Sequence, residues 1–178
     1  HPLPASVDQL VAAVVRRRLR IRDELRAQVR RLLDADITPT HLDTHKHTHL
    51  LPAIAEAVGE LASEFHIRWV RRPLLPRAVS RLLEGRMLRH GSRVTDHFRG
   101  FGLTGRLNTA SLVRLLRGLK PGLTELMCHP GRLDDELCGA ATRLKESREQ
   151  ELRALTSPEV KAAVREGRIE LTGYRWLG

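Results

Sequence analysis

Two different spacings of hydrophobic residues alternate along this sequence. Over residues 7–33, apolar side chains recur every three or four positions, at Leu10, Val14, Ile21, Leu25, Val29 and Leu32. This period is that of an amphipathic helix, so the segment predicts one long helix or two joined helices. Ser6 is the expected N-cap, and Pro39 follows the expected end of the helical run.

After residue 39, short apolar runs typical of strands alternate with further helical segments. Strands are expected at residues 40–45, 66–70, 124–128 and 168–174, with a short one near 96–98, and helices at 52–62, 74–83, 108–119, 140–155 and 158–166. The alternation predicts an α/β fold of one domain, residues 1–178, with parallel strands joined by helical crossovers. In such folds, ligands bind at the carboxyl ends of the strands.

The composition, 41% hydrophobic and 29% charged, is that of a globular protein. No apolar run approaches the roughly 20 residues that cross a bilayer. The first residues show no secretory signal pattern, so a cytoplasmic protein without membrane insertion is expected. Cys128 and Cys138 do not form a CxxC motif, which predicts free thiols rather than a disulfide framework or a thiolate zinc site.

The formal net charge of +10 raises the question of nucleic-acid binding, because clustered Lys and Arg release counterions from a phosphate backbone. Here the arginines are spread along the chain. The densest run, at residues 16–22, precedes Asp23 and Glu24 in a helical pattern, and aromatic residues make up only 3%. A solvated helix face explains this pattern better than a nucleic-acid surface.

The densest chemical signal is the segment 41–49, HLDTHKHTH. Its imidazoles and carboxylate belong to His41, Asp43, His45, His47 and His49. All occupy odd positions, so in an extended segment they share one face, and the residues between them, such as Thr44, face the other way. Imidazole and carboxylate are typical ligands of zinc and similar ions. A hydrogen-bonded or exposed role is the simpler interpretation of any one histidine, but the group favours metal binding, with one or two members in a supporting position.

A second signal is ELMCHPG, at residues 125–131. An apolar strand that ends in His129 and Pro130 presents an imidazole at a turn, where it could transfer a proton to a substrate. A loop histidine held by structural hydrogen bonds is the alternative, and the sequence leaves both open. Glu125 either orients this ring or faces solvent. Asp134 or Asp135 is expected to cap a helix rather than to contact substrate.

In chain order, THLDTHKHTHLLP, VRRP, ELMCHPG and SREQEL..LTSPEV resemble the YdjC-like carbohydrate deacetylases, a family that includes chito-oligosaccharide deacetylases and hopanoid-biosynthesis-associated relatives. The likeness runs from about Arg20 onward. It implies an irregular (β/α) barrel of the glycoside hydrolase/deacetylase type, incomplete here, with roughly the C-terminal two-thirds present. It also implies one divalent metal, Mg²⁺ or Zn²⁺, and removal of an acetyl group from an N-acetylated sugar or oligosaccharide.

The resemblance also implies roles for individual residues. His45 matches the family's first histidine after the HLD[ST] segment, which is a metal ligand. His129 matches the candidate general acid. The positions that line the same pocket match Asp43, His47, His49 and Arg71.

The sequence departs from the family pattern in having no Asp-Asp-Phe-Gly-like segment and no counterpart of the histidine ligand from the second N-terminal strand. A truncated gene model and a degenerate paralogue both explain this. Weak metal binding and impaired turnover are then expected, because the base and two of the three family ligands are absent. Exposed sheet edges would favour a homodimer. The alternative to a hydrolase is a non-catalytic remnant that binds sugar or metal, or acts as a partner subunit.

Overall fold

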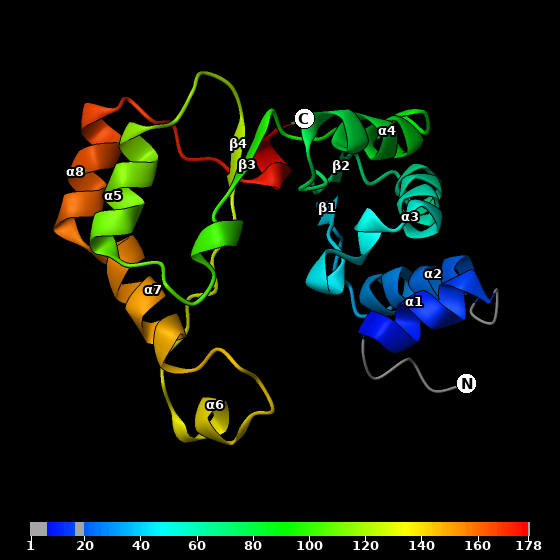
Figure 1. The fold of residues 1–178 in the computed structure, drawn as a ribbon, viewed down its shortest axis with the longest axis horizontal. Coiled ribbons are helices and arrows are strands. Elements are labelled where there is room, and N and C mark those ends of the chain that lie inside the picture. The colour runs from blue at the N-terminus through cyan, green and yellow to red at the C-terminus, as the bar shows by residue number, and fades with distance from the viewer. Residues whose placement is uncertain (1–6, 17–19, 178) are drawn as a thin grey trace. The chain divides into compact units, whose positions relative to one another are not determined.

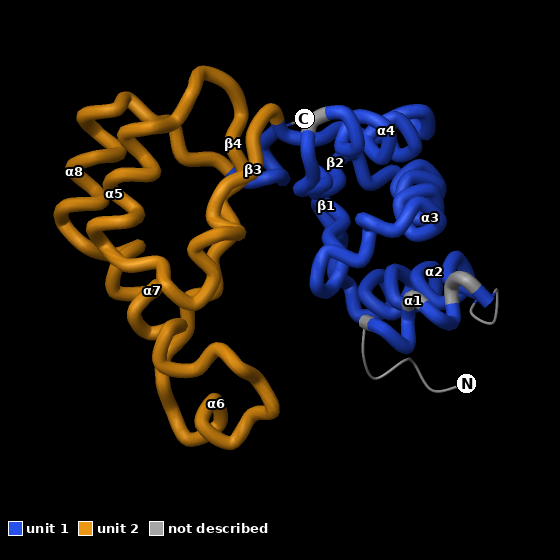
Figure 2. The backbone as a smooth tube through the Cα atoms, viewed as in Figure 1, with its two compact units in different colours: residues 1–95, 173–178 blue, residues 96–172 orange. Residues whose placement is uncertain are grey.

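The computed structural model describes residues 7–16 and 20–177, where helices alternate with short strands (Figure 1). The chain divides into two compact units (Figure 2). Unit 1 comprises residues 1–95 and 173–178, and unit 2 comprises residues 96–172. Each unit has a hydrophobic core of its own.

Unit 1 joins parallel strands through helices. Its elements are α1 (Val7–Val15), α2 (Ile21–Leu33), β1 (His41–Leu42), the 3-10 segment η1 (His45–Leu50), α3 (Pro52–Glu64), β2 (Trp69–Val70), α4 (Arg77–Leu88) and the 3-10 turn η3 (Tyr174–Trp176). The expected N-cap Ser6 lies outside the described residues. In the parallel pair β1–β2, His41 lies opposite Trp69, which also forms a parallel bridge with Arg93.

Helix α3 supplies much of the unit 1 core. Pro52 suits the first helical position, where a backbone N–H would have no intrahelical partner. Ala55 of α3 and Met87 of α4 are fully buried. A Cβ at Gly59 would lie only 2.9 Å from Met87 Cα and 3.1 Å from His90 Cδ2. The glycine that lowers helix propensity therefore allows α3 and α4 to approach closely.

Unit 2 repeats the alternation of strands and helices. Its elements are β3 (His97–Arg99), the 3-10 turn η2 (Phe101–Leu103), α5 (Thr109–Arg117), β4 (Thr124–Leu126), α6 (Asp135–Gly139), α7 (Glu146–Thr156) and α8 (Pro158–Glu166). Strands β3 and β4 are parallel, with Phe98 opposite Glu125. Helices α5 and α8 pack side by side (Figure 1), and the core buries Leu107, Leu112 and Ala154.

The expected α/β class with parallel strands is confirmed, but the strand expected at residues 168–174 is wrong. A strand needs a hydrogen-bonded neighbour, and no strand of the described residues pairs with this segment. The N–H of Ile169 instead donates to the Val164 carbonyl at 3.0 Å, just after α8, and Leu171 is 76% exposed. The incomplete barrel and the single domain over 1–178 stay predictions.

The helix expected at residues 140–155 begins only at Glu146, because a short helix and a turn come first. That short helix, α6, starts at Asp135, and Asp134 Oδ1 accepts the Leu137 N–H at 2.8 Å. The predicted capping role of Asp134 is thus confirmed. None of the described helices has the length and apolar character needed to cross a membrane.

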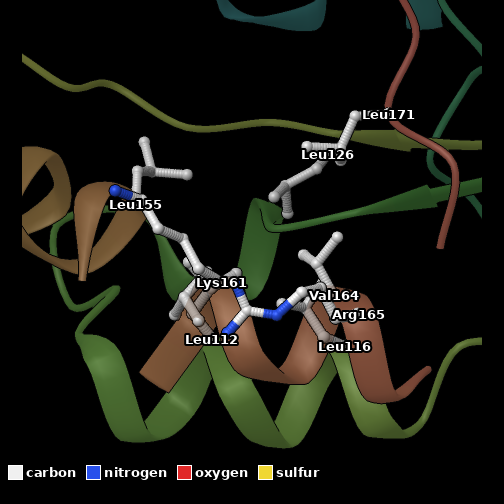
Figure 3. A pocket seen from close by; sticks show the side chains of 9 residues that line it. Leu112, Leu116, Leu126, Leu155, Lys161, Val164, Arg165 and Leu171 are labelled. Atoms are coloured by element: carbon white, nitrogen blue, oxygen red, sulfur yellow. The ribbon is translucent and has the colours of Figure 1, made fainter. Parts of the chain in front are cut away.

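An apolar hollow of about 350 Å³ is lined by α5, α7, α8, β4 and Leu171 in unit 2 (Figure 3). Most of its walls are the side chains of Leu112, Leu116, Leu126, Leu155, Val160 and Val164, with Lys161 and Arg165 as the charged members. None of the described residues that line it carries an imidazole, a carboxylate or a hydroxyl group. The hollow therefore offers no groups for the metal and proton chemistry considered below.

Helix α5 begins with a capping box, which supports a prediction about stability. Asn108 Oδ1 accepts the Ser111 N–H at 2.9 Å, and Ser111 Oγ accepts the Asn108 N–H at 2.9 Å. Asn108→Ala should lower the free energy of unfolding by about 1 kcal/mol, because a helix N–H loses its acceptor. Chemical denaturation followed by circular dichroism would measure this, with Asn108→Ser as the control that keeps an acceptor. An unchanged midpoint in Asn108→Ala would contradict the prediction.

Candidate functional site

The histidine-rich segment forms a tight turn directly after β1. Extended backbone reaches Thr44, and residues 45–50 then form η1. The expectation of one extended segment with all odd positions on one face is therefore wrong. Lys46 and His47 adopt left-handed backbone angles, with φ of 52° and 55°. This conformation costs non-glycine residues roughly 1–2 kcal/mol each. Such strain is concentrated at functional sites.

The turn gathers three side chains that could hold a metal. Ligand atoms of Asp43, His47 and His49 all lie within 4.8 Å of one another. The two imidazole rings meet edge to face, with centroids 5.8 Å apart. Two atoms bonded to one zinc ion at about 2.1 Å lie no more than about 4.2 Å apart, so small side-chain rotations suffice to close the group around a single ion.

His49 is the buried member of this group, with 1% of its surface exposed. Its Nδ1 lies 2.7 Å from Thr44 Oγ1, and that hydroxyl oxygen also accepts the His49 amide N–H at 3.0 Å. Burial lowers the pKa of His49 to about 4, helped by His47 and opposed chiefly by Asp43. The ring is therefore neutral at pH 7. Its Nε2 is buried and makes no hydrogen bond with the described residues. The backbone of Arg72 also acts on this ring and opposes the effect of burial. An imidazole whose Nδ1 is held by a neighbour is oriented as metal ligands commonly are.

Arg71 and Thr44 support the group. Arg71 Nη1 donates to Asp43 Oδ2, and the Arg71 amide N–H donates to the Leu42 carbonyl at 2.9 Å. A carboxylate has two oxygens, so this ion pair leaves one for a cation. Thr44, which was expected to face away from the histidines, contacts His49 because the chain turns between them.

His45, the metal ligand that the family resemblance implies, is not a member of this group. It is exposed and opens η1. His41 lies in β1, where its ring stacks on Tyr174 with centroids 4.2 Å apart. The assignment of His45 as a ligand stays a prediction, whereas the geometry favours His47 and His49.

Glu56, Glu60 and His90 form a second group with metal-ligand spacing in unit 1. Arginines neutralise it: Arg89 pairs with Glu56 at 2.5 Å, and Arg22 pairs with Glu60 at 3.2 Å. The hydrogen bond from His90, at 2.7 Å, is the largest cause that lowers the pKa of Glu56. Because both carboxylates and the imidazole of this group already have partners, it is better explained as an ion-pair network.

In unit 2, His129 lies beside a buried carboxylate. The ladder before it reaches Met127, whose N–H donates to the Arg99 carbonyl at 2.9 Å. The His129 N–H then donates to Glu151 Oε2 at 2.5 Å, and the ring Nδ1 lies 3.9 Å from the same oxygen. Glu151, on α7, is 1% exposed. From the sequence, Glu125 and not Glu151 was the candidate for the residue that orients His129. The burial of Glu151 could not be predicted, because the sequence around it is that of a charged, solvent-exposed helix.

Comparisons with known proteins identify the family of this chain. The chain belongs to the YdjC-like protein family, whose model matches residues 2–166. Curated relatives named carbohydrate deacetylase include the Brevibacillus brevis protein, which is 33% identical over 172 residues, with 96% of this chain and 65% of the relative covered. The Vibrio cholerae relative is 35% identical over 153 residues, and the match covers 85% of this chain and 56% of the relative. The chain thus spans between 56% and 65% of the length of these curated relatives.

A solved structure supports the fold. It is that of an Enterococcus faecalis V583 protein assigned to cellobiose-phosphate cleavage, and it matches with a TM-score of 0.76 at 25% identity. The match covers 88% of this chain and 60% of that one. The arrangement of helices and parallel strands is therefore shared with an experimental structure of a longer chain.

Proposed function

We propose that this chain is part of a metal-dependent hydrolase that removes the acetyl group from an N-acetylated sugar or oligosaccharide. The observation that carries the proposal is buried His49, whose Nε2 makes no hydrogen bond with the described residues and whose ring has a nitrogen within 4.8 Å of ligand atoms of Asp43 and His47. The relatives named carbohydrate deacetylase support the substrate class. Incomplete (β/α) barrel geometry and a homodimer stay parts of this proposal.

The donor set favours Zn²⁺ over Mg²⁺. Two imidazoles and one carboxylate are typical zinc ligands, whereas Mg²⁺ prefers oxygen ligands and retains several waters. Three protein ligands are also the number typical of catalytic rather than structural zinc sites. A bound divalent ion would supply Lewis-acid chemistry toward the acetamido carbonyl.

The surrounding side chains would hold the ligands in place. Thr44 bonds His49 through Nδ1, which leaves Nε2 for the ion. Arg71 holds one oxygen of Asp43. Partners of this kind fix the orientation of a ligand before it binds metal, so less reorganisation is needed.

We assign His129 the role of general acid. Hydrolysis adds the oxygen of water to the acetyl carbon and breaks the C–N bond, and the leaving amine nitrogen takes up a proton, here from His129. The proton lost by water needs a base, which in the family comes from the Asp-Asp segment that these 178 residues do not contain. We therefore expect low turnover from these residues alone.

A non-catalytic role is the second candidate. The observation that favours it is the partial span, 56–65%, of the curated relatives. A chain that binds metal and sugar without turnover, or that needs a partner subunit for the base, would have the same Asp43, His47 and His49 group.

Two measurements on the 178-residue chain test the proposal. Isothermal titration calorimetry with ZnCl₂ and MgCl₂ should show near-stoichiometric zinc binding, at least about tenfold tighter than magnesium binding. Acetate release from a chito-oligosaccharide should then rise above the level of the chelator-treated protein. Zinc binding without acetate release would support the non-catalytic candidate. No zinc binding would overturn both.

A further inference from the structure

Glu151 is a buried acid that the proposed reaction does not yet use. It lies in the middle of α7 and is 1% exposed. Among the described residues, its one ion-pair partner is His129. An ionised carboxylate is costly to bury without compensation, so a glutamate at such a position requires an explanation.

Two backbone groups account for part of that compensation. Glu151 Oε2 accepts the His129 N–H at 2.5 Å, and Oε1 accepts the Gly105 N–H at 3.4 Å. These bonds alone would make Glu151 a link between two loops. The bond to the His129 N–H also brings the same oxygen to 3.9 Å from Nδ1 of that residue's ring.

Arg148, a basic residue on the same helix as Glu151, does not pair with its carboxylate. Arg148 Nε donates to the Leu144 carbonyl at 3.1 Å. The Arg148 stem lies 3.5 Å from where a Cβ on Gly131 would be. Within the described residues, no arginine or lysine forms an ion pair with Glu151. The imidazole of His129 is thus the group on which the carboxylate charge acts most directly.

The ring nitrogen that faces Glu151 also needs a partner. His129 Nδ1 is buried and has no hydrogen-bond partner among the described residues. A buried polar atom without a partner is costly, and a modest rotation of the ring would bring Nδ1 within hydrogen-bond distance of the carboxylate. That contact requires the proton to be on Nδ1, because an ionised carboxylate only accepts.

We infer that Glu151 is a positioning residue for His129: it keeps a proton on Nδ1, so that the doubly protonated ring gives the proton on Nε2 to the leaving amine and is left as the neutral Nδ1–H tautomer. The inference rests on the proposed function for the identity of the reaction. The tautomer is a property of this chain alone. A carboxylate that orients an imidazole in this way is a general device for fixing which nitrogen reacts.

The test is the tautomer of neutral His129, read from side-chain ¹⁵N chemical shifts of the ¹⁵N-labelled full chain. A His129→Asn spectrum assigns the signals. In the unsubstituted chain, Nδ1–H should predominate. Glu151→Gln should shift the ratio of the two tautomers toward Nε2–H by at least about tenfold, because the charge that favours Nδ1–H is lost.

Two further variants guard the interpretation. Glu149→Gln removes the same charge from the same helix, at a residue that pairs with Arg153, and should leave the ratio unchanged. Glu151→Asp keeps the charge and should retain a majority of Nδ1–H. Predominant Nε2–H in the unsubstituted chain, or equal ratios with and without Glu151, would overturn the inference, even if Glu151→Gln failed to fold. Since the readout needs no turnover, absence of deacetylation would count against the proposed function and leave this result standing.

Discussion

Replacing His49 by alanine should lower the affinity of the chain for Zn²⁺ by at least about 100-fold, because loss of a ligand exceeds the 10–100-fold effect of losing an outer-shell partner. The physical reason is that His49 offers a neutral imidazole whose ring is grouped with Asp43 and His47. Isothermal titration calorimetry with ZnCl₂ measures the loss. His47→Ala, at a half-buried position, should behave in the same way.

The matched control is His45→Ala, which removes an exposed imidazole from the same turn. It should bind Zn²⁺ about as tightly as the unsubstituted chain. The reverse pattern, with binding lost in His45→Ala and retained in His49→Ala, would show that the ligand implied by the family resemblance is right and the group in the structure is not. Circular dichroism should confirm that each variant is folded, since His49 is part of the packed interior.

Gly100→Ala should destabilise the chain by at least about 3 kcal/mol, the largest stability effect expected here. Gly100 has φ of +97°, and a Cβ there would lie 2.1 Å from the Met127 carbonyl oxygen. The neighbouring residue Arg99 accepts the Met127 N–H at 2.9 Å, so the backbone cannot move apart without breaking the ladder that leads to His129. The midpoint of thermal unfolding should fall by about 6–12 °C.

Gly102→Ala is the control for that experiment. It adds the same methyl group two residues later, where nothing lies within 4 Å of the added atom and the backbone angle is ordinary. Its thermal midpoint should stay close to that of the unsubstituted chain. Equal midpoints for Gly100→Ala and Gly102→Ala would refute the argument from the Met127 carbonyl.

The helices with local start signals were predictable from the sequence. Pro52 and Pro158 each stand at the first position of a helix, and both segments, α3 and α8, begin where the sequence placed them. The spacing of apolar residues then predicted how far these helices extend, because it indicates one buried face without reference to distant residues. Residues 168–174 were not predictable in this way, because a strand depends on a partner elsewhere in the chain.

The chemistry of the candidate metal group was also visible in the sequence, but its geometry was not. Four histidines and an aspartate within nine residues indicated metal binding from residue type alone. The turn that brings Asp43, His47 and His49 together depends on left-handed backbone angles at Lys46 and His47. Such angles are usually predicted from a glycine or an asparagine, and neither residue type is present at these two positions. Glu151 was missed for a related reason, since its burial arises from packing.

The chain leaves unit 1 after Thr95 and returns to it at Gly173, so this unit is encoded by two separate stretches. The returning stretch carries Tyr174, whose ring stacks on His41 and lies 5.9 Å from that of Trp69. Cutting the gene after codon 95 would therefore produce a unit 1 that lacks the aromatic cover of its own two-stranded sheet. Unit 2 is thus inserted in the sequence of unit 1. A shorter protein that keeps the histidine turn would need a linker joining Thr95 directly to Gly173 in place of residues 96–172.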